Sequence, residues 1–229
     1  MANSKSLSSP APLIVFDCDG TLVDSQYGII AAMEAAFRAH KLDIPTAGDV
    51  RRVVGLPLDA AIERLLPNGA SVDIDRMVEA YRNASDERRR LDADEEPMFS
   101  GVREVLAALA SSGYALGVAT GKSRRGLHET LRRHDLADYF QTLKSADDGP
   151  GKPNPAILRD AMSETGAAPQ ATVMIGDTTY DIQMAVNAGS LSIGVSWGYH
   201  ETDELSATGA NCIAQSFHEL PALIARFWD

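Results

Sequence analysis

Short apolar runs recur along the chain, and each ends at polar or glycine-containing residues. The runs are LIVF before Asp17, YALGVAT at 114–120, TVMIGD at 172–177, LSIGVS at 191–196 and, more weakly, NCIA at 211–214. Continuous apolar runs, rather than alternating ones, are typical of strands buried on both faces of a parallel sheet. We therefore expect these segments to be the strands of one such sheet.

Helical patterns separate the predicted strands. The segment GVREVLAALASSG at 101–113 repeats apolar residues on one helix face and stops at Gly113. The segments PAILRDAMSETG and DIQMAVNAG stop in the same way at Gly166 and Gly189. Alternating strands and helices predict an α/β fold with a doubly wound, Rossmann-like parallel sheet, in which ligands bind at the carboxyl ends of the strands.

The interval between Ser25 and Pro97 shows helical periodicity and no convincing strand. We interpret residues 26–96 as an α-helical cap domain inserted after the first strand, with the acidic stretch DADEEP as its return linker. The predicted division is a flexible tail at 1–11, an α/β core formed by 12–25 and 97–229, and the cap. The cap would lie directly above the Asp17 end of the sheet.

The net charge of −11 restricts the partners of the protein. Nucleic acids and anionic membranes need clustered Lys and Arg, so we expect neither as a partner. A small anionic substrate fits only if a local site reverses the sign of the charge. The two cysteines suggest no disulfide framework, no apolar run is long enough to span a membrane, and the first nine residues are polar. These features predict a cytoplasmic protein.

Four motifs lie at the expected carboxyl ends of strands. They are DCDGT at 17–21, VATG at 118–121, GKPNP at 151–155 and GDTTYD at 176–181. Together they resemble the haloacid dehalogenase (HAD) superfamily of phosphohydrolases, in the subgroup with a helical cap after the first strand, and most of all its phosphoglycolate phosphatase type. The resemblance covers nearly the whole chain from Pro12. It implies Mg²⁺-dependent hydrolysis of a small phosphomonoester, such as phosphoglycolate, through an aspartyl-phosphate intermediate.

The resemblance assigns the two acids of DCDGT distinct roles. Asp17 would attack phosphorus in line as the nucleophile. Asp19 would donate a proton to the leaving alkoxide and then take one from the attacking water. Gly20 permits the tight turn, and Thr21 offers a hydroxyl or backbone donor to the substrate. The plain alternative, two acids that cap a turn, becomes a poor account when GT follows a buried strand.

A carboxylate that attacks a phosphate dianion needs a cation beside it. In the family, Mg²⁺ is held by the side chain equivalent to Asp17, by the main-chain carbonyl of Asp19, and by Asp177, with Asp181 acting through water or by orienting its neighbours. Oxygen donors of this kind suit Mg²⁺. The alternative is that Asp177 and Asp181 simply begin a helix, where acids favour the positive end of the dipole.

Further residues are predicted to grip the phosphoryl group or the rest of the substrate. Thr120 and the Gly121 amide would hold a phosphoryl oxygen, and Lys152 would screen its charge and restrain Asp17. In GKSRRGL at 121–127, cations crowd an expected helix start. We expect one or more of them, Arg124 first, to face the cleft or to pair with acids of the cap. Arg52 precedes the turn VVGLPL, our candidate cap loop above the site.

Other functions remain to be weighed against a phosphatase. A 2-haloacid dehalogenase would need neither Asp19 nor Asp177, and a phosphonatase needs a cap lysine, for which only Lys41 is present between residues 25 and 96. A β-phosphoglucomutase-like mutase shares all the core residues and is the serious alternative, as is a phosphatase for another phosphorylated metabolite. A catalytically idle scaffold has no support. The predicted partner is a small phosphorylated metabolite, and we expect a monomer or a homodimer.

Overall fold

The computed structural model describes residues 10–67, 70, 72–91 and 96–228. Within this part of the chain, a six-stranded sheet has the strand order β3-β2-β1-β4-β5-β6, and every pairing is parallel. The strands are β1 (Leu13–Phe16), β2 (Ala115–Ala119), β3 (Thr142–Lys144), β4 (Thr172–Gly176), β5 (Leu191–Val195) and β6 (Cys212–Ala214). The predicted doubly wound α/β fold is confirmed.

Strand β3 is the one element of this sheet that the hydrophobic pattern did not predict. It is three residues long, TLK, and lies at the edge of the sheet beside β2. Its Lys144 forms ion pairs with Asp160 and Glu164 of α7 (Ala156–Thr165). An edge strand this short carries too few apolar residues to produce a recognisable run, and charged edge residues protect it from pairing with other chains.

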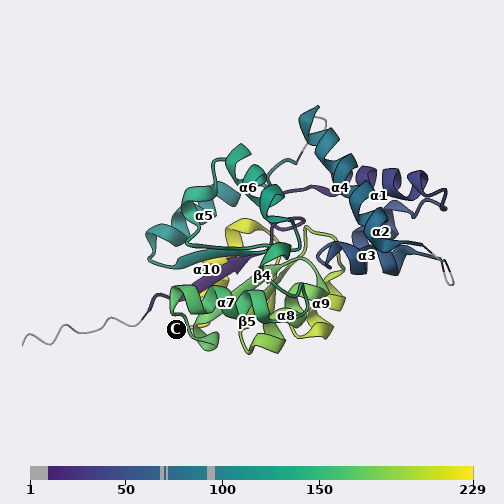
Figure 1. The fold of residues 1–229 in the computed structure, drawn as a ribbon. Helices are drawn as coiled ribbons and strands as arrows, with labels where there is room; N and C mark the ends of the chain where they lie inside the picture. The colour runs from purple at the N-terminus through teal and green to yellow at the C-terminus, as the bar shows by residue number, and fades with distance from the viewer. Residues whose placement is uncertain (1–9, 68–69, 71, 92–95, 229) are drawn as a thin grey trace, which may run out of the picture.

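The alternation of side chains along β1 divides the core into two layers. Ile14 and Phe16 pack with α5 (Val102–Ser111), α6 (Arg124–Arg133) and α10 (Leu220–Ala225), whereas Leu13 and Val15 pack with α7 and α8 (Thr179–Ala188). Successive strand residues point to opposite faces, so a continuous apolar run buries both. Figure 1 shows the helices on either side of the sheet. Helix α9 (Thr202–Thr208) follows β5.

The central strands end together. Phe16, the last residue of β1, is paired with Val118 of β2 and Ile175 of β4. The Asp17 amide then donates to the Ile175 carbonyl at 2.9 Å. This register brings the residues that follow β1, β2 and β4 to one edge, the position at which α/β sheets bind ligands.

The cap is the group of helices between β1 and α5. It contains α1 (Gln26–Ala39), α2 (Ala47–Val53), α3 (Leu58–Leu65) and α4 (Ile74–Arg90). These helices bury a small core of their own, formed by Met33, Phe37, Val50, Ile62 and Met77. Figure 1 shows them gathered on one side of the molecule, apart from the helices that flank the sheet. The inserted helical cap is confirmed. Of the predicted return linker, residues 92–95 lie outside the described residues, and the domain boundaries stay predictions.

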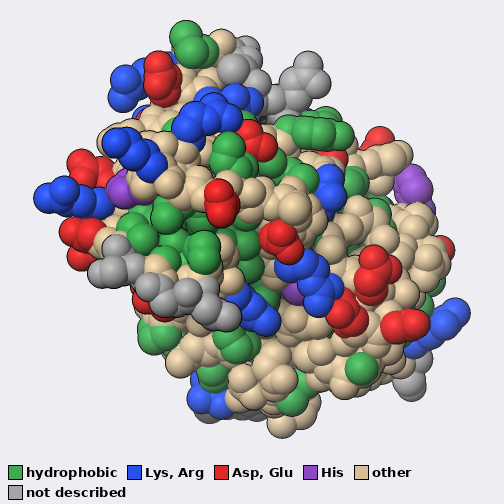
Figure 2. Space-filling view, turned by 90° about the vertical axis from the view of Figure 1, so that its right-hand side faces the viewer, with side chains coloured by type: hydrophobic (Ala, Val, Ile, Leu, Met, Phe, Trp, Pro, Cys, Tyr) green, Lys and Arg blue, Asp and Glu red, His purple; other side chains and the backbone are tan. Residues whose placement is uncertain are grey.

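The surface on the cap side carries mixed charge. Figure 2 views the molecule from this side and shows basic and acidic side chains interspersed, with a hydrophobic area between them. None of the helices in the described residues is long and apolar enough to cross a membrane.

Candidate active site

Three aspartates meet at the carboxyl ends of the central strands. Asp17 follows β1, Asp177 follows β4, and Asp181 lies in the first turn of α8, with one carboxylate oxygen of each within 4.8 Å of the others. All three side chains are buried. Buried carboxylates this close repel one another unless a proton or a positive charge offsets them.

Lys152 supplies one of these positive charges. Its Nζ lies 2.8 Å from Oδ1 of Asp17 and 2.5 Å from Oδ1 of Asp181. The distances are those of ion pairs, although the angles are not those of hydrogen bonds. Burial opposes the charged ammonium, but the carboxylates of Asp17 and Asp181 nevertheless hold the pKa of Lys152 above its usual value. The structure therefore brings Lys152 to Asp17, as expected from the sequence.

Asp17 is still short of positive partners. Burial raises its pKa from 3.8 to about 7, with Lys152 opposing the rise and Asp181 adding to it. Its Oδ2 is buried and accepts no hydrogen bond within the described part of the chain. A buried acceptor of this kind needs a partner that the surrounding protein does not provide.

Asp177 is fixed by donors on both sides. The Thr21 hydroxyl donates to Oδ1 at 2.9 Å, and the Tyr199 amide donates to Oδ2 at 2.9 Å. Burial, followed by the charges of Asp17 and Asp181, raises the pKa of Asp177 well above its usual value. The hydroxyl of Thr21 is thus engaged with Asp177, so any contact it makes with substrate must be shared with this bond.

Gly20 allows the turn after β1 to approach Asp177. Its φ of +83° lies in the left-handed region, and a Cβ built there would come within 2.3 Å of Asp177 Oδ2. Any other residue would therefore displace the carboxylate. The predicted role of Gly20 in a tight turn accordingly extends to the packing of the aspartate cluster.

Asp181 uses its two oxygens for different purposes. Oδ2 accepts from the Thr178 amide at 3.1 Å and from the Thr178 hydroxyl at 2.7 Å, which forms the capping box of α8. Oδ1 points to Lys152 and the cluster. The two interpretations from sequence, helix capping and metal-site residue, are therefore compatible in one side chain.

The donor set of the cluster fits a divalent cation. Three carboxylates offer hard oxygen ligands, two of them (Asp17 and Asp181) have buried oxygens without a hydrogen bond, and Lys152 offsets only part of their charge. Hard oxygen donors of this kind suit Mg²⁺ or Ca²⁺ better than thiol- or imidazole-preferring metals. The identity of the ion, and the contribution of the Asp19 carbonyl, stay predictions.

The side chain of Asp19 is held by a hydroxyl and an ammonium. Ser25 Oγ donates to Asp19 Oδ1 at 2.6 Å, and Lys122 Nζ lies 2.6 Å from the same oxygen. Lys122 also pairs with Glu96 at 3.2 Å. Burial lowers the pKa of Lys122, but the charges of Asp19 and Glu96 outweigh this effect and raise it well above its usual value. The sequence grouped Lys122 with its basic neighbours and missed this contact, because Glu96 and Asp19 are distant in the chain.

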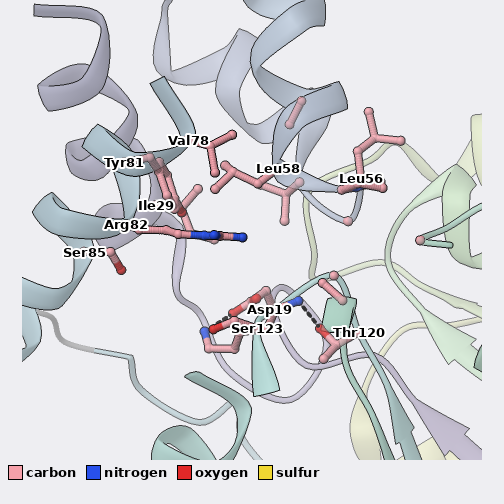
Figure 3. A pocket seen from close by; sticks show the side chains of 18 of the residues that line it. Asp19, Ile29, Leu56, Leu58, Val78, Tyr81, Arg82, Ser85, Thr120 and Ser123 are labelled. Carbon is pink, nitrogen blue, oxygen red and sulfur yellow. Dashed lines mark hydrogen bonds and ion pairs between the residues drawn. The ribbon is translucent and has the colours of Figure 1, made fainter. Parts of the chain in front are cut away.

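Thr120 and Gly121 lie where β2 ends, beneath the cap. The Thr120 hydroxyl accepts from the Lys122 amide at 3.2 Å. A Cβ on Gly121 would come within 3.0 Å of the Gly55 carbonyl oxygen, so the predicted cap loop lies directly against this strand end. Figure 3 shows Leu56 and Leu58 above Thr120.

A pocket of about 800 Å³ separates the cap from these residues. Its cap wall is largely apolar and includes Ile29, Leu58 and Val78, and its floor includes Asp19 and Thr120 (Figure 3). A small ligand can therefore contact the catalytic candidates below and the cap above at the same time.

Two of the predicted substrate contacts have other partners in the structure. Arg52 forms ion pairs of 2.5 and 2.8 Å with Glu204 of α9, which lowers the pKa of Glu204 to about 2. Arg124 pairs with Asp148 at 2.5 Å. Neither arginine lines the pocket. Carboxylates that are distant in sequence engage both side chains, a competition that the sequence alone does not reveal.

Arg125 follows the second alternative stated for the basic segment. It lies 3.1 Å from Asp86 of α4 and 2.9 Å from Glu129 of α6, so it links the core to the cap. The sequence predicted cleft-facing cations or pairs with cap acids, and this residue makes such a pair at the edge of the pocket.

Known sequences and structures are similar to this chain over most of its length. Residues 14–195 match the family described as haloacid dehalogenase-like hydrolase. "Probable phosphatase IndB" of Dickeya dadantii (strain 3937) is 38% identical over 212 residues, 91% of each chain. "Phosphoglycolate phosphatase" of Vibrio vulnificus (strain YJ016) is 32% identical, over 91% of this chain and 93% of the relative. The crystal structure of a "predicted phosphatase" from Clostridium acetobutylicum superposes with a TM-score of 0.85 at 26% identity, covering 95% of this chain and 100% of that one.

Proposed function

Because the chain belongs to the haloacid dehalogenase-like hydrolases and is a phosphatase, we propose that it hydrolyses a small phosphomonoester through an aspartyl-phosphate at Asp17, with Mg²⁺ bound. The observation that carries this proposal is the buried cluster of Asp17, Asp177 and Asp181 with Lys152 beside it. A phosphoglycolate-like ester is the proposed substrate, as the name of the Vibrio relative suggests.

Asp17 is the proposed nucleophile. An Asp17 oxygen attacks phosphorus, the P–O bond to the leaving alkoxide breaks, and the phosphoryl group becomes bonded to Asp17. Water then attacks this phosphorus and releases phosphate and the free carboxylate. Lys152 restrains Asp17 Oδ1 and offsets negative charge during both displacements, as its 2.8 Å ion pair suggests.

Bound Mg²⁺ supplies positive charge that favours the ionised form of Asp17 and offsets the charge of the phosphoryl oxygens. Asp17 and Asp177 are the residues that would hold it, with Asp181 orienting the cluster through Lys152. Thr21 and the Tyr199 amide keep the Asp177 carboxylate in place for this role.

Asp19 is the proposed general acid and base. It protonates the leaving alkoxide in the first displacement and accepts a proton from water in the second. Ser25 and Lys122 both contact Asp19 Oδ1, which orients the carboxylate toward the pocket. Thr120 and the Gly121 amide are the proposed donors to the phosphoryl oxygens.

A phosphosugar mutase is the second candidate, since it would use the same core residues. One experiment separates a phosphatase from a mutase. Purified protein is incubated with a panel of phosphorylated metabolites, with and without Mg²⁺, and phosphate release is measured. A phosphatase releases phosphate only with the divalent cation, and Asp17→Asn abolishes release while the exposed control Asp203→Asn does not. Conversion of β-glucose 1-phosphate to the 6-phosphate without net phosphate release would favour the mutase instead.

The remaining expectations concern the setting of the enzyme. The oligomeric state (a monomer or a homodimer), a small phosphorylated metabolite as partner, and a location in the cytoplasm stay predictions. Sedimentation of the purified chain tests the oligomeric state directly.

A further inference from the structure

The pocket contains more negative than positive side chains. Among the described residues, seven carboxylates and four cations line it. An anionic substrate needs local positive charge, because the surrounding protein is acidic as a whole. Among the described residues that line the pocket, the four cations are the groups that can supply this charge.

Three of these cations are already engaged. Lys122 pairs with Asp19 and Glu96. Arg89 pairs with Asp86 and Glu129, and Arg125 pairs with the same two carboxylates. Their charges are largely offset before any substrate enters.

Arg82 is the fourth cation, and within the described part of the chain it forms no hydrogen bond or ion pair. It lies on α4, and Figure 3 shows its side chain extending from this helix into the space between Leu58 of the cap and Asp19 of the core. Its guanidinium is thus exposed to the pocket, with its donors available to a ligand.

We propose that Arg82 binds a second anionic group of the substrate, a carboxylate or a second phosphate, while the reacting phosphoryl group lies at Asp17. The inference rests on the proposed phosphatase function and adds a specificity-determining residue: Arg82 would select phosphomonoesters with a second anion on the alcohol part, the class to which phosphoglycolate belongs.

The chemistry of the wall favours this class over a neutral ester. Apolar cap residues that line the pocket with Arg82, among them Ile29, Leu58 and Val78, offer no hydrogen-bond acceptors on their side chains. A guanidinium binds a carboxylate or a phosphate with two parallel hydrogen bonds. A hydroxyl at the same place accepts hydrogen bonds but carries no negative charge to pair with the guanidinium.

The test uses matched substrates. Phosphoglycolate and 3-phosphopropionate carry the carboxylate, ethane-1,2-diol and propane-1,3-diol bisphosphates carry the second phosphate, and 2-hydroxyethyl and 3-hydroxypropyl phosphates are the neutral counterparts. kcat/KM is measured for the wild type, Arg82→Gln, Arg82→Lys and the control Arg76→Gln. Arg76 lies on the same helix, is 78% exposed and does not line the pocket.

The wild type should prefer one series with a second anion over the counterparts that end in an uncharged hydroxyl. Arg82→Gln should lower kcat/KM for that series roughly 10- to 100-fold, the value of a hydrogen bond to a charged group, and leave the neutral esters within about twofold. Arg82→Lys should retain part of the preference, and Arg76→Gln all of it. The series that responds distinguishes a carboxylate from a phosphate.

Two failures have different meanings. If the wild type releases phosphate from none of these esters with Mg²⁺, the proposed function fails and the inference with it. If the wild type is active but has no preference for a second anion, or if Arg82→Gln keeps that preference, the phosphatase stands and the role of Arg82 is contradicted. Thermal unfolding of each variant shows whether a loss of activity reflects a loss of folding. Arg82→Lys keeps a positive charge at the same exposed position.

Discussion

At the scale of single residues, the site depends on how closely the backbone of Gly20 approaches Asp177. A side chain there meets two obstacles, a φ of +83° and a contact of 2.3 Å with the carboxylate. The first costs about 1–2 kcal/mol for an L-residue, and the second displaces a catalytic candidate.

Gly20→Ala should therefore lose more than stability. We expect a drop in kcat of about 100-fold or more, since a displacement of about 1 Å at a site has an effect of this size, and a weaker response to Mg²⁺. Gly113→Ala is the matched control, because Gly113 has a similar φ of +87° but no atom within 4 Å of its built Cβ. Equal kinetic effects in the two variants would contradict this account.

Single residues also show where sequence reasoning ends. Asp17, Asp177, Asp181 and Lys152 could be found because each follows a strand or lies in a short motif, and parallel strands end at one edge. Arg52 was assigned to substrate from its place before the candidate cap loop and Arg124 from its charge at a helix start, whereas each pairs with a carboxylate distant in sequence. The availability of a cation depends on its tertiary partners, which a linear pattern does not contain.

At the scale of elements, the ends of β1 and β4 and the start of α8 bring three carboxylates together. The pKa of Asp17 is raised to about 7 from 3.8, chiefly by burial, and that of Asp177 is raised by the same cause. Between these two values, and without metal, the folded protein holds a proton on Asp17 that the unfolded chain has released. The contribution of Asp17 to stability is therefore present below its unfolded pKa and is lost as the pH rises through about 7.

Divalent cations should reverse this loss. Without Mg²⁺, the free energy of unfolding should fall between about pH 4 and pH 7. At pH 8, Mg²⁺ at about 100 times its Kd should add about 2.7 kcal/mol, which raises Tm by about 5–10 °C for a chain of this size.

Asp177→Asn provides the comparison for this prediction. The substitution removes one buried carboxylate from the cluster. The variant should therefore lose most of the rise in Tm with Mg²⁺ and, without metal, much of the pH dependence of its unfolding free energy. Calorimetric scans of both proteins, with chelator and with Mg²⁺, give the measurement. A Tm that does not respond to Mg²⁺ in the wild type would count against the metal site.

The elements themselves were predicted with uneven success, for a physical reason. Buried strands such as β1 and β4 are continuous apolar runs, and helices such as α7 and α8 end at glycines with positive φ, so both leave clear patterns. The edge strand β3 is held by its pairing with β2 and by the ion pairs of Lys144, neither of which is local in sequence.

At the scale of the whole molecule, the cap and core meet through exposed ion pairs as well as across the pocket. Arg52 of α2 pairs with Glu204 of α9, and Arg125 of α6 pairs with Asp86 of α4. Exposed pairs contribute little to stability. These two pairs therefore add little to the free energy that holds the cap against the core.

Arg52→Gln tests whether this residue belongs to that contact or to substrate binding. We expect a change in unfolding free energy of about 0–1 kcal/mol and a KM within about twofold of the wild type for every ester of the panel. Urea unfolding and steady-state kinetics supply the two values. A large rise in KM confined to anionic substrates would restore Arg52 as a substrate contact.

The covalent step at Asp17 is the claim from which the other roles follow. Its most direct test is to quench the Mg²⁺-loaded enzyme in acid within its first turnovers of a good ester and to locate the added phosphoryl group by peptide mass spectrometry. The account predicts a phosphorylated peptide modified at Asp17, absent from Asp17→Asn and present in Asp203→Asn. A phosphoryl group on another residue, or undiminished phosphate release by Asp17→Asn, would contradict it.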